Sequence, residues 1–312
     1  MEMLGMILTI LGLALFESIT SIDNAIINAE VLSKMSQRAR KWFLLWGLLI
    51  AVFLVRGLLP GMILWAANPS LGFDGVITAT FSSDPMVIEA MEQTGPVLLI
   101  AGGIFMIFLF FHWLFLEPKY YGLVGEKFIA SQGVWFFAVV SILLTVITWY
   151  AIDYNSAMAF GAVVGSTAFF IVHGFKQNAE LHEKELLGTG GSGLSDLSKL
   201  LYLEVIDATF SIDGVVGAFA FTMAIPLILV GNGIGAFVVR EFTIRNIENV
   251  KKYVYLKNGA MYSILFLGAI MILDSFGHEI PSWISPVITF AIVGYFFWKS
   301  KEHIKNGSGK PE

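Results

Sequence analysis

Two short stretches of the sequence place acidic side chains in otherwise apolar surroundings. The first, Phe16–Ala25, reads FESITSIDNA, and the second, Glu204–Val215, reads EVIDATFSIDGV. Both contain Ser-Ile-Asp with a second carboxylate six residues before the Asp, so the two stretches form a short internal repeat. Carboxylate, hydroxyl, amide and carbonyl oxygens are the ligands that hard cations such as Mg²⁺, Ca²⁺ and Mn²⁺ prefer. Because the chain has no Cys and neither stretch has a His, a dedicated Zn²⁺ or Cu⁺ site is disfavoured.

The candidate metal ligands are the acids of the two stretches and the amide that follows the first Ser-Ile-Asp: Glu17, Asp23, Asn24, Glu204, Asp207 and Asp213. In the repeat, Glu17 matches Asp207 and Asp23 matches Asp213. Residues six apart lie about 120° apart around a regular helix. Glu17 and Asp23 therefore converge only if the helix unwinds between them or if partners come from the other copy. The Ser and Thr residues between them can bend a helix by bonding to its backbone, and unwinding would expose carbonyl ligands.

The composition is that of a membrane protein. Of the 312 residues, 56% are hydrophobic and only 14% are charged, whereas soluble domains carry roughly a quarter charged residues. The absence of Cys excludes disulfides, thiolate metal sites and cysteine catalysis. Met1–Gly5 has no basic region, so we expect no cleavable signal peptide. We expect the lipid bilayer, and no nucleic acid, as a partner.

Apolar runs of the length that a membrane helix needs, about 20 residues, predict an all-α polytopic membrane protein. We predict about nine transmembrane helices, at residues 5–32, 43–67, 96–116, 133–152, 155–175, 200–222, 226–240, 259–276 and 283–299. When the loop 33–42 is placed on the cytoplasmic side, every Lys and Arg except Arg56 falls on that side of the alternating spans. Because cytoplasmic loops carry the excess of Lys and Arg, this pattern predicts an outer N-terminus and an inner C-terminus.

The spans divide into two halves. We expect a first half at residues 1–175 with an outer loop at 68–95, a flexible cytoplasmic linker at 176–199, a second half at 200–299 and a disordered tail at 300–312. The two acidic stretches lie five predicted spans apart, so they cross the membrane in opposite directions. This predicts an inverted-topology internal repeat, an architecture in which secondary transporters bind substrates near the midplane.

Acids outnumber bases within the predicted spans. A carboxylate at the centre of a bilayer is costly, and Arg56 is the only base expected inside a span. The acids therefore need a bound cation, protons or water. Arg56 either lines the pathway or fixes helix packing through an ion pair. Asn232, within the segment VGNGIG at 230–235, is either a ligand or part of a close helix contact.

The two stretches resemble the motifs of the TerC family of integral membrane proteins, which is named for tellurium resistance and grouped with the lysine exporter superfamily. The segments that carry the resemblance are 21–25 with the basic loop 36–40, Asp207 with 211–214, 235–240 and 260–262. Gly214 stands where that family often has Ser, and the chain has more predicted spans than its typical members, so it looks like a divergent branch.

The resemblance implies transport of divalent cations, manganese efflux above all, and in some members the supply of metal to exported proteins. It implies that Glu17, Asp23 and Asn24 occupy the positions of the first motif, and that Asp207 and Asp213 occupy those of the second. It also implies location in a bacterial inner (plasma) membrane.

We therefore expect a transporter, not an enzyme, that exports Mn²⁺ by alternating access, with Ca²⁺ and Mg²⁺ as alternative ions. Asp23 and Asp213 are the expected central ligands, with Glu17, Asp207 and Glu204 supporting them. Protons are candidate counter-ions, and no tightly bound cofactor is expected. Two other hypotheses stay open: a metal-delivery or assembly partner in a membrane complex, and an intramembrane aspartyl enzyme whose aspartates act as acid and base. The oligomeric state stays open as well.

Overall fold

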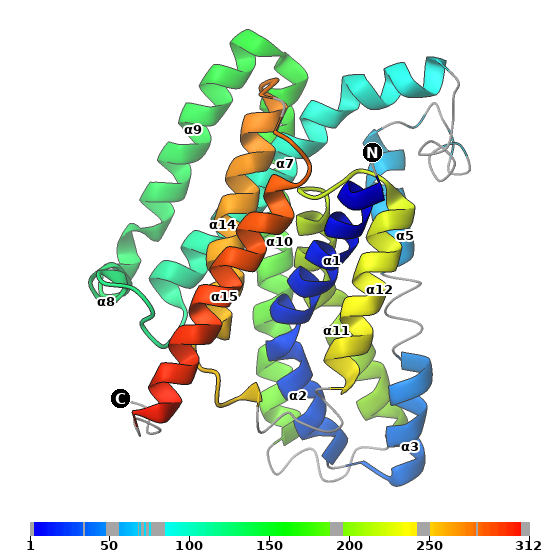
Figure 1. Ribbon diagram of the computed structural model, residues 1–312, viewed down its shortest axis with the longest axis vertical. Helices are drawn as coiled ribbons and strands as arrows, with labels where there is room; N and C mark the ends of the chain where they lie inside the picture. Colours follow the sequence, from blue (N-terminus) through cyan, green and yellow to red (C-terminus); the bar gives the residue numbers. More distant parts are fainter. Residues whose placement is uncertain are drawn as a thin grey trace.

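Helices make up every element in the described part of the computed structural model, and the longer ones run alongside one another (Figure 1). The structure describes residues 3–33, 35–47, 56–67, 69, 72, 75, 85–187, 196–241, 250–278 and 280–306. Part of the predicted span 43–67 and half of the predicted outer loop 68–95 lie outside these ranges.

Most of the long helices alternate in direction along the chain, whereas the first two helices run in the same direction (Figure 1). The first part forms α1 (Met3–Thr20), α2 (Ile22–Ser33), α3 (Gln37–Trp42), the π-helical turn η1 (Phe43–Gly47), α5 (Arg56–Ala67) and α7 (Pro85–Leu116). The middle forms α8 (Glu126–Ala130), the 3-10 turn η4 (Gly133–Trp135), α9 (Phe136–Tyr154) and α10 (Ser156–Leu187). The last part forms α11 (Asp196–Ala218), α12 (Ile225–Glu241), α14 (Leu256–Ser275) and α15 (Ile284–Lys305). The predicted all-α class is confirmed for the described residues.

Several helices have the length and apolar character of membrane spans. Five of the described segments are long and apolar enough to cross a membrane: Met3–Thr20, Gln93–Leu116, Gly133–Tyr154, Ser156–Gln177 and Leu256–Ser275. Large apolar side chains on α9, such as Phe137 and Trp149, are exposed on the outside of the bundle. An apolar outer surface on long apolar helices is what contact with a lipid bilayer requires.

Helix α7 is the centre of the bundle and packs against both α10 and α14. Small residues allow the close approach, because a Cβ at Gly165 of α10 would overlap the carbonyl oxygen of Ala101 on α7. Aromatic side chains fill the remaining space, and the rings of Phe108 and Phe169 meet edge to face with their centroids 5.7 Å apart. Glycines at helix crossings are typical of membrane helix packing.

The first acidic stretch crosses a bend instead of lying in one straight helix. Helix α1 ends at Thr20 and α2 begins at Ile22, with a turn at Ser21 between them. The interruption is local, since the backbone N–H of Ser21 still donates to the carbonyl of Glu17 at 3.1 Å and that of Ala25 donates to Ser21 at 2.9 Å. The predicted single span 5–32 is therefore two helices joined at a bend.

Two hydroxyl groups bond to the helix backbone just before this bend. Ser18 Oγ donates to the carbonyl oxygen of Ala14 at 2.6 Å, and Thr20 Oγ1 donates to that of Phe16 at 2.9 Å. Hydroxyls that compete for carbonyls one turn back weaken and bend a helix. The bend lies between Glu17 and Asp23, in agreement with one of the two alternatives for these acids, an unwinding between them, whereas α11 continues unbroken through the second stretch.

Three helices extend beyond their predicted boundaries. Helix α7 begins at Pro85, inside the predicted outer loop, α10 continues to Leu187, inside the predicted linker, and α15 continues to Lys305, inside the predicted tail. Residues 176–187 of α10 read KQNAELHEKELL, which is rich in strong helix formers and has no Gly or Pro to end the helix. Polar residues mark the end of an apolar run but do not end the helix that carries it.

Candidate cation site between α1 and α11

The two helices that carry the acidic stretches pack against each other in antiparallel orientation. A Cβ at Gly12 of α1 would lie 2.9 Å from the ring of Phe221, just beyond α11, and a Cβ at Gly214 would lie 2.7 Å from Oε2 of Glu17. Residue numbers therefore fall along α11 as they rise along α1, and Figure 1 shows the two helices running in opposite directions. This is the relation that an inverted repeat requires.

Glu17 is enclosed between three helices and is only 1% exposed. Its Oε1 accepts a hydrogen bond of 2.7 Å from the hydroxyl of Ser21, and its Oε2 faces Gly214 of α11. On the other side, a Cβ at Gly235 of α12 would lie 2.6 Å from the Cβ of Glu17. The two glycines thus make room for the acid, which lies beside the residue that follows Asp213.

Asp213 is buried and paired with a base that the sequence analysis placed outside the spans. The ammonium of Lys176, on α10, forms an ion pair with Oδ2 of Asp213, and each residue is 9% exposed. Oδ1 of Asp213 has no hydrogen-bond partner within the described residues. Lys176 belongs to the segment Ser156–Gln177, which is long and apolar enough to cross a membrane. A second base besides Arg56 therefore lies within a candidate membrane span.

The other candidate ligands lie on described helices, but their side chains lie outside the described part of the structure. Asp23 and Asn24 are in the first turn of α2, and Glu204 and Asp207 are in the middle of α11. The same limit applies to the side chain of Arg56, at the start of α5. Within the described residues, no three acidic or His side chains converge into a ready-made metal site.

The helix register nevertheless relates these positions to one another. Near the far end of the pair, Leu32 of α2 belongs to the same buried cluster as Leu203 of α11. The antiparallel register found at Glu17 is therefore kept on the other side of the bend. Asp23, between Glu17 and Leu32, and Asp207, between Leu203 and Gly214, therefore both lie on the part of the helix pair between these two contacts.

A second polar cluster, formed by His112, Glu117, His173 and Lys257, lies at the end of α7. His112 Nδ1 is 3.2 Å from one carboxylate oxygen of Glu117, and Lys257 Nζ is 3.0 Å from the other. The ring centroids of His112 and His173 are 3.8 Å apart, and His173 precedes Lys176 by one turn of α10. Burial opposes ionisation of Glu117, but the hydrogen bond to His112 and the charge of Lys257 outweigh it and hold the pKa of Glu117 well below its usual value.

Asn232 is fully buried on α12, and neither its Oδ1 nor its Nδ2 has a hydrogen-bond partner within the described residues. The flanking glycines face α1, since a Cβ at Gly231 would lie 2.5 Å from the Cβ of Leu13 and one at Gly235 would meet Glu17. The glycines therefore serve close helix packing. A buried amide without a hydrogen-bond partner is energetically unfavourable. Asn232 therefore remains a candidate ligand, since a bound ion would give its Oδ1 a partner.

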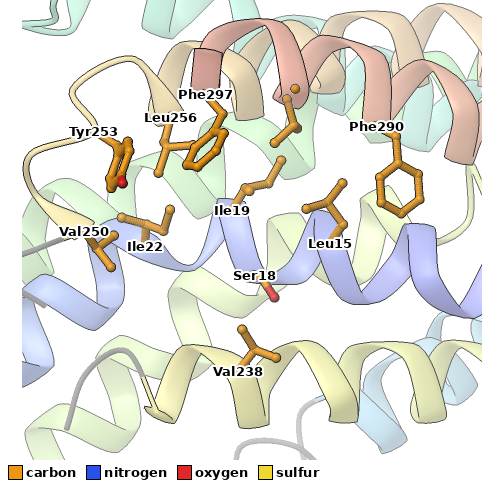
Figure 2. Close-up of a pocket in the computed structure, with 12 residues that line it drawn as sticks. Leu15, Ser18, Ile19, Ile22, Val238, Val250, Tyr253, Leu256, Phe290 and Phe297 are labelled. Atoms are coloured by element: carbon orange, nitrogen blue, oxygen red, sulfur yellow. The ribbon is translucent and has the colours of Figure 1, made fainter. Parts of the chain in front are cut away.

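An apolar groove lies on another face of α1 and is separate from the acids (Figure 2). Its volume is about 590 Å³, and Ile19 of α1, Val238 of α12 and Phe290 of α15 are among its lining residues. Ser18 and Tyr253 contribute the polar atoms of the lining, which contains no acid. The surface of this groove suits an apolar occupant, whereas the chemistry that suits a cation lies between α1 and α11.

Sequence reasoning missed two buried charged residues. Lys176 follows the last apolar residues of its span, a position where Lys usually extends to the membrane surface. Its spacing of three from His173, which sets both on one helix face, is the signal that it belongs to a polar stripe. Glu126, in a short polar segment, gave no such signal, yet it accepts hydrogen bonds from Gly122 N at 2.6 Å and Tyr262 Oη at 2.8 Å and so ties α8 to α14.

Comparison with known proteins places the chain in a family. Residues 22–306 match the family described as protein of unknown function (DUF475), so the match includes Asp23 and Asp213 and begins after Glu17. No curated protein and no solved structure matches the chain. Because the matched segment covers most of its length, the chain belongs to the DUF475 family.

Proposed function

We propose that this protein is a transporter that exports a hard divalent cation from the cytoplasm, with Mn²⁺ as the first candidate and Ca²⁺ or Mg²⁺ as alternatives. The observation that carries the proposal is the burial of Glu17 against Gly214, which places one acid of the first stretch beside the residue that follows Asp213. Two buried acids on repeat-related helices support a cation site, because carboxylates within a bilayer need a positive charge, a proton or water to compensate them.

The donor set supports a hard cation in particular. The described side chains contribute carboxylates from Glu17 and Asp213 and the hydroxyl of Ser21. Asp23 and Asp207 would add further oxygens from the same helix pair. Divalent ions such as Ca²⁺ take six or more oxygen ligands, so a site of this kind draws on both copies of the repeat. The choice of Mn²⁺ rests on the resemblance of both stretches to the TerC motifs.

Alternating access fits the helix pair. Helix α1–α2 bends at Ser21, whereas α11 is continuous, so the two copies differ at the point where the acids lie. On this proposal the α1–α2 bend closes one side of the site while the other side opens. In secondary transporters, interrupted helices at corresponding positions of the two halves form the binding site; here the helix of the first copy is interrupted and α11 of the second copy is not.

The proposal is tested by ion uptake into liposomes that contain the purified protein, comparing Mn²⁺, Mg²⁺, Ca²⁺ and Zn²⁺. We expect flux of one hard cation that Asp23→Asn and Asp213→Asn both abolish. Asp153→Asn is the matched control, because Asp153 is an exposed acid at the end of α9, and we expect it to leave the flux unchanged. Flux that survives both motif substitutions would refute the proposal. Running the assay with and without a pH gradient tests whether protons are the counter-ion.

The role of metal delivery within a membrane complex is the second hypothesis that the same assay addresses. It predicts binding of the cation that needs both aspartates, but no flux through the isolated protein, together with subunits that copurify. An intramembrane aspartyl enzyme would instead require cleavage of a substrate that Asp23→Asn abolishes.

A further inference from the structure

Lys176 and Asp213 form an ion pair across two helices at the centre of the candidate site. Lys176 comes from α10 and Asp213 from α11, and each is 9% exposed. The ammonium contacts Oδ2, while Oδ1 has no hydrogen-bond partner within the described residues. One oxygen of the carboxylate is therefore paired with the ammonium, and the other could bind a ligand.

We propose that the ammonium of Lys176 is a built-in counter-cation for Asp213, which the transported divalent cation displaces when it binds. This inference rests on the proposed transport function. In the empty protein the ammonium neutralises the carboxylate, so the site is stable without a metal. A divalent cation on Asp213 would lie within a few ångströms of the ammonium, and like charges at that distance in a poorly screened interior repel strongly. Binding of the two cations is therefore competitive.

Lys176 lies close to exposed residues, towards which a displaced ammonium could move. Lys176 lies near the end of the apolar segment Ser156–Gln177, and the next residue, Gln177, is exposed. Lys has a long flexible side chain that can keep its stem along an apolar surface while its charge moves towards water. On this proposal, the Lys176 side chain leaves Asp213 by rotation about its own bonds.

This exchange has a consequence for the transport cycle. After the cation is released, the ammonium returns to Asp213 and restores a neutral pair. The empty protein can then change conformation without a proton on Asp213. Proton exchange, where it occurs, would fall to the other acids of the site, such as Glu17.

The experiment measures Mn²⁺ affinity by calorimetric titration of the purified protein and of Lys176→Met, which keeps the length of the side chain and removes its charge. We expect the dissociation constant for Mn²⁺ to fall by about tenfold or more in Lys176→Met, because the competitor is gone. Lys176→Arg keeps the charge and should bind as the unmodified protein does. Lys127→Met, at an exposed Lys of α8, is the matched control and should leave the affinity unchanged.

A measurement on the unmodified protein protects the test against poor folding of the variant. Labelling with an amine-reactive reagent, read by mass spectrometry at Lys176, should increase severalfold when Mn²⁺ is added, because the displaced ammonium becomes accessible. Mn²⁺ affinity that is unchanged or weaker in Lys176→Met, or labelling of Lys176 that Mn²⁺ does not increase, would overturn the inference. If the unmodified protein binds none of Mn²⁺, Ca²⁺ and Mg²⁺, or if Asp213→Asn binds the ion equally well, the proposed function itself has failed.

Discussion

Gly214→Ala is the substitution that separates the chemistry of the site from the stability of the fold. A Cβ at this position would lie 2.7 Å from Oε2 of Glu17, and its next neighbour, the carboxyl carbon of the same residue, would be 3.8 Å away. The new methyl group therefore touches only the end of one flexible side chain. At Gly235, by contrast, a Cβ would lie 2.8 Å from the backbone carbonyl oxygen of Ala14, which cannot move without moving α1.

The expected magnitudes differ for folding and for binding. The carboxylate of Glu17 must retreat by several tenths of an ångström, which strains its hydrogen bond from Ser21, an interaction worth about 1–3 kcal/mol. Replacing Gly by Ala in a helix stabilises the helix by about 0.5–1 kcal/mol. We therefore expect the free energy of unfolding to change by no more than about 2 kcal/mol. Metal ligands tolerate displacements of only about 0.2 Å, so we expect Mn²⁺ to bind about tenfold to a hundredfold more weakly.

The assay compares thermal unfolding and Mn²⁺ affinity in Gly214→Ala and in Gly174→Ala. Gly174 is an exposed helical glycine on α10, where a Cβ would meet nothing within 4 Å. The control should keep its affinity and gain a little stability. Normal Mn²⁺ affinity in Gly214→Ala would refute the placement of Glu17 in the site, and gross unfolding of this variant would refute the packing that we describe.

Three further predictions concern packing, buried polarity and charge. Gly165→Ala should destabilise the protein by about 1–3 kcal/mol or more in thermal unfolding, because its Cβ would overlap the backbone carbonyl of Ala101 and force α7 and α10 apart. Asn232→Thr should raise the unfolding temperature, because both polar atoms of the buried amide lack a described partner. A Thr hydroxyl in a helix can instead bond to the carbonyl one turn back, as Thr289 does at 2.9 Å. A lower unfolding temperature would contradict this prediction. Glu117→Gln should lower the free energy of unfolding by about 1–2 kcal/mol near neutral pH. Because the pKa of Glu117 is lowered in the folded state, its carboxylate stabilises the protein above the ordinary pKa of 4.5, and this stabilisation is lost as the pH falls below that value. The stability gap should therefore close in unfolding measurements at acid pH, and a gap that widens there would refute the assignment.

The acidic repeat shows which structural features can be predicted from local sequence patterns. The spacing of Glu17 and Asp23 left two alternatives, a helix that unwinds between them or partners from the other copy, and the structure has a turn at Ser21, next to the hydroxyls of Ser18 and Thr20. The all-helical class follows from the same apolar runs. These features depend on residues within one or two helical turns, so they can be read from the sequence.

The partner of Asp213 could not be predicted in this way. Lys176 lies 37 positions earlier in the chain, and the pair forms only because α10 and α11 pack side by side. The cluster around Glu117 has the same character, since His112 and Lys257 come from helices far apart in the sequence. Helix ends were also misjudged, because polarity shows where an apolar run ends and helix propensity decides where the helix ends.

The central claim is that acids from both copies of the repeat bind one hard divalent cation. It is tested most directly by electron paramagnetic resonance of Mn²⁺ titrated into the purified protein, because the sharp spectrum of the free aqueous ion is lost when the ion binds. We predict that the unmodified protein and Asp153→Asn bind a single Mn²⁺ per chain, and that neither Glu17→Gln nor Asp213→Asn binds it at the same concentration. Retention of the bound ion in both motif variants would contradict the account.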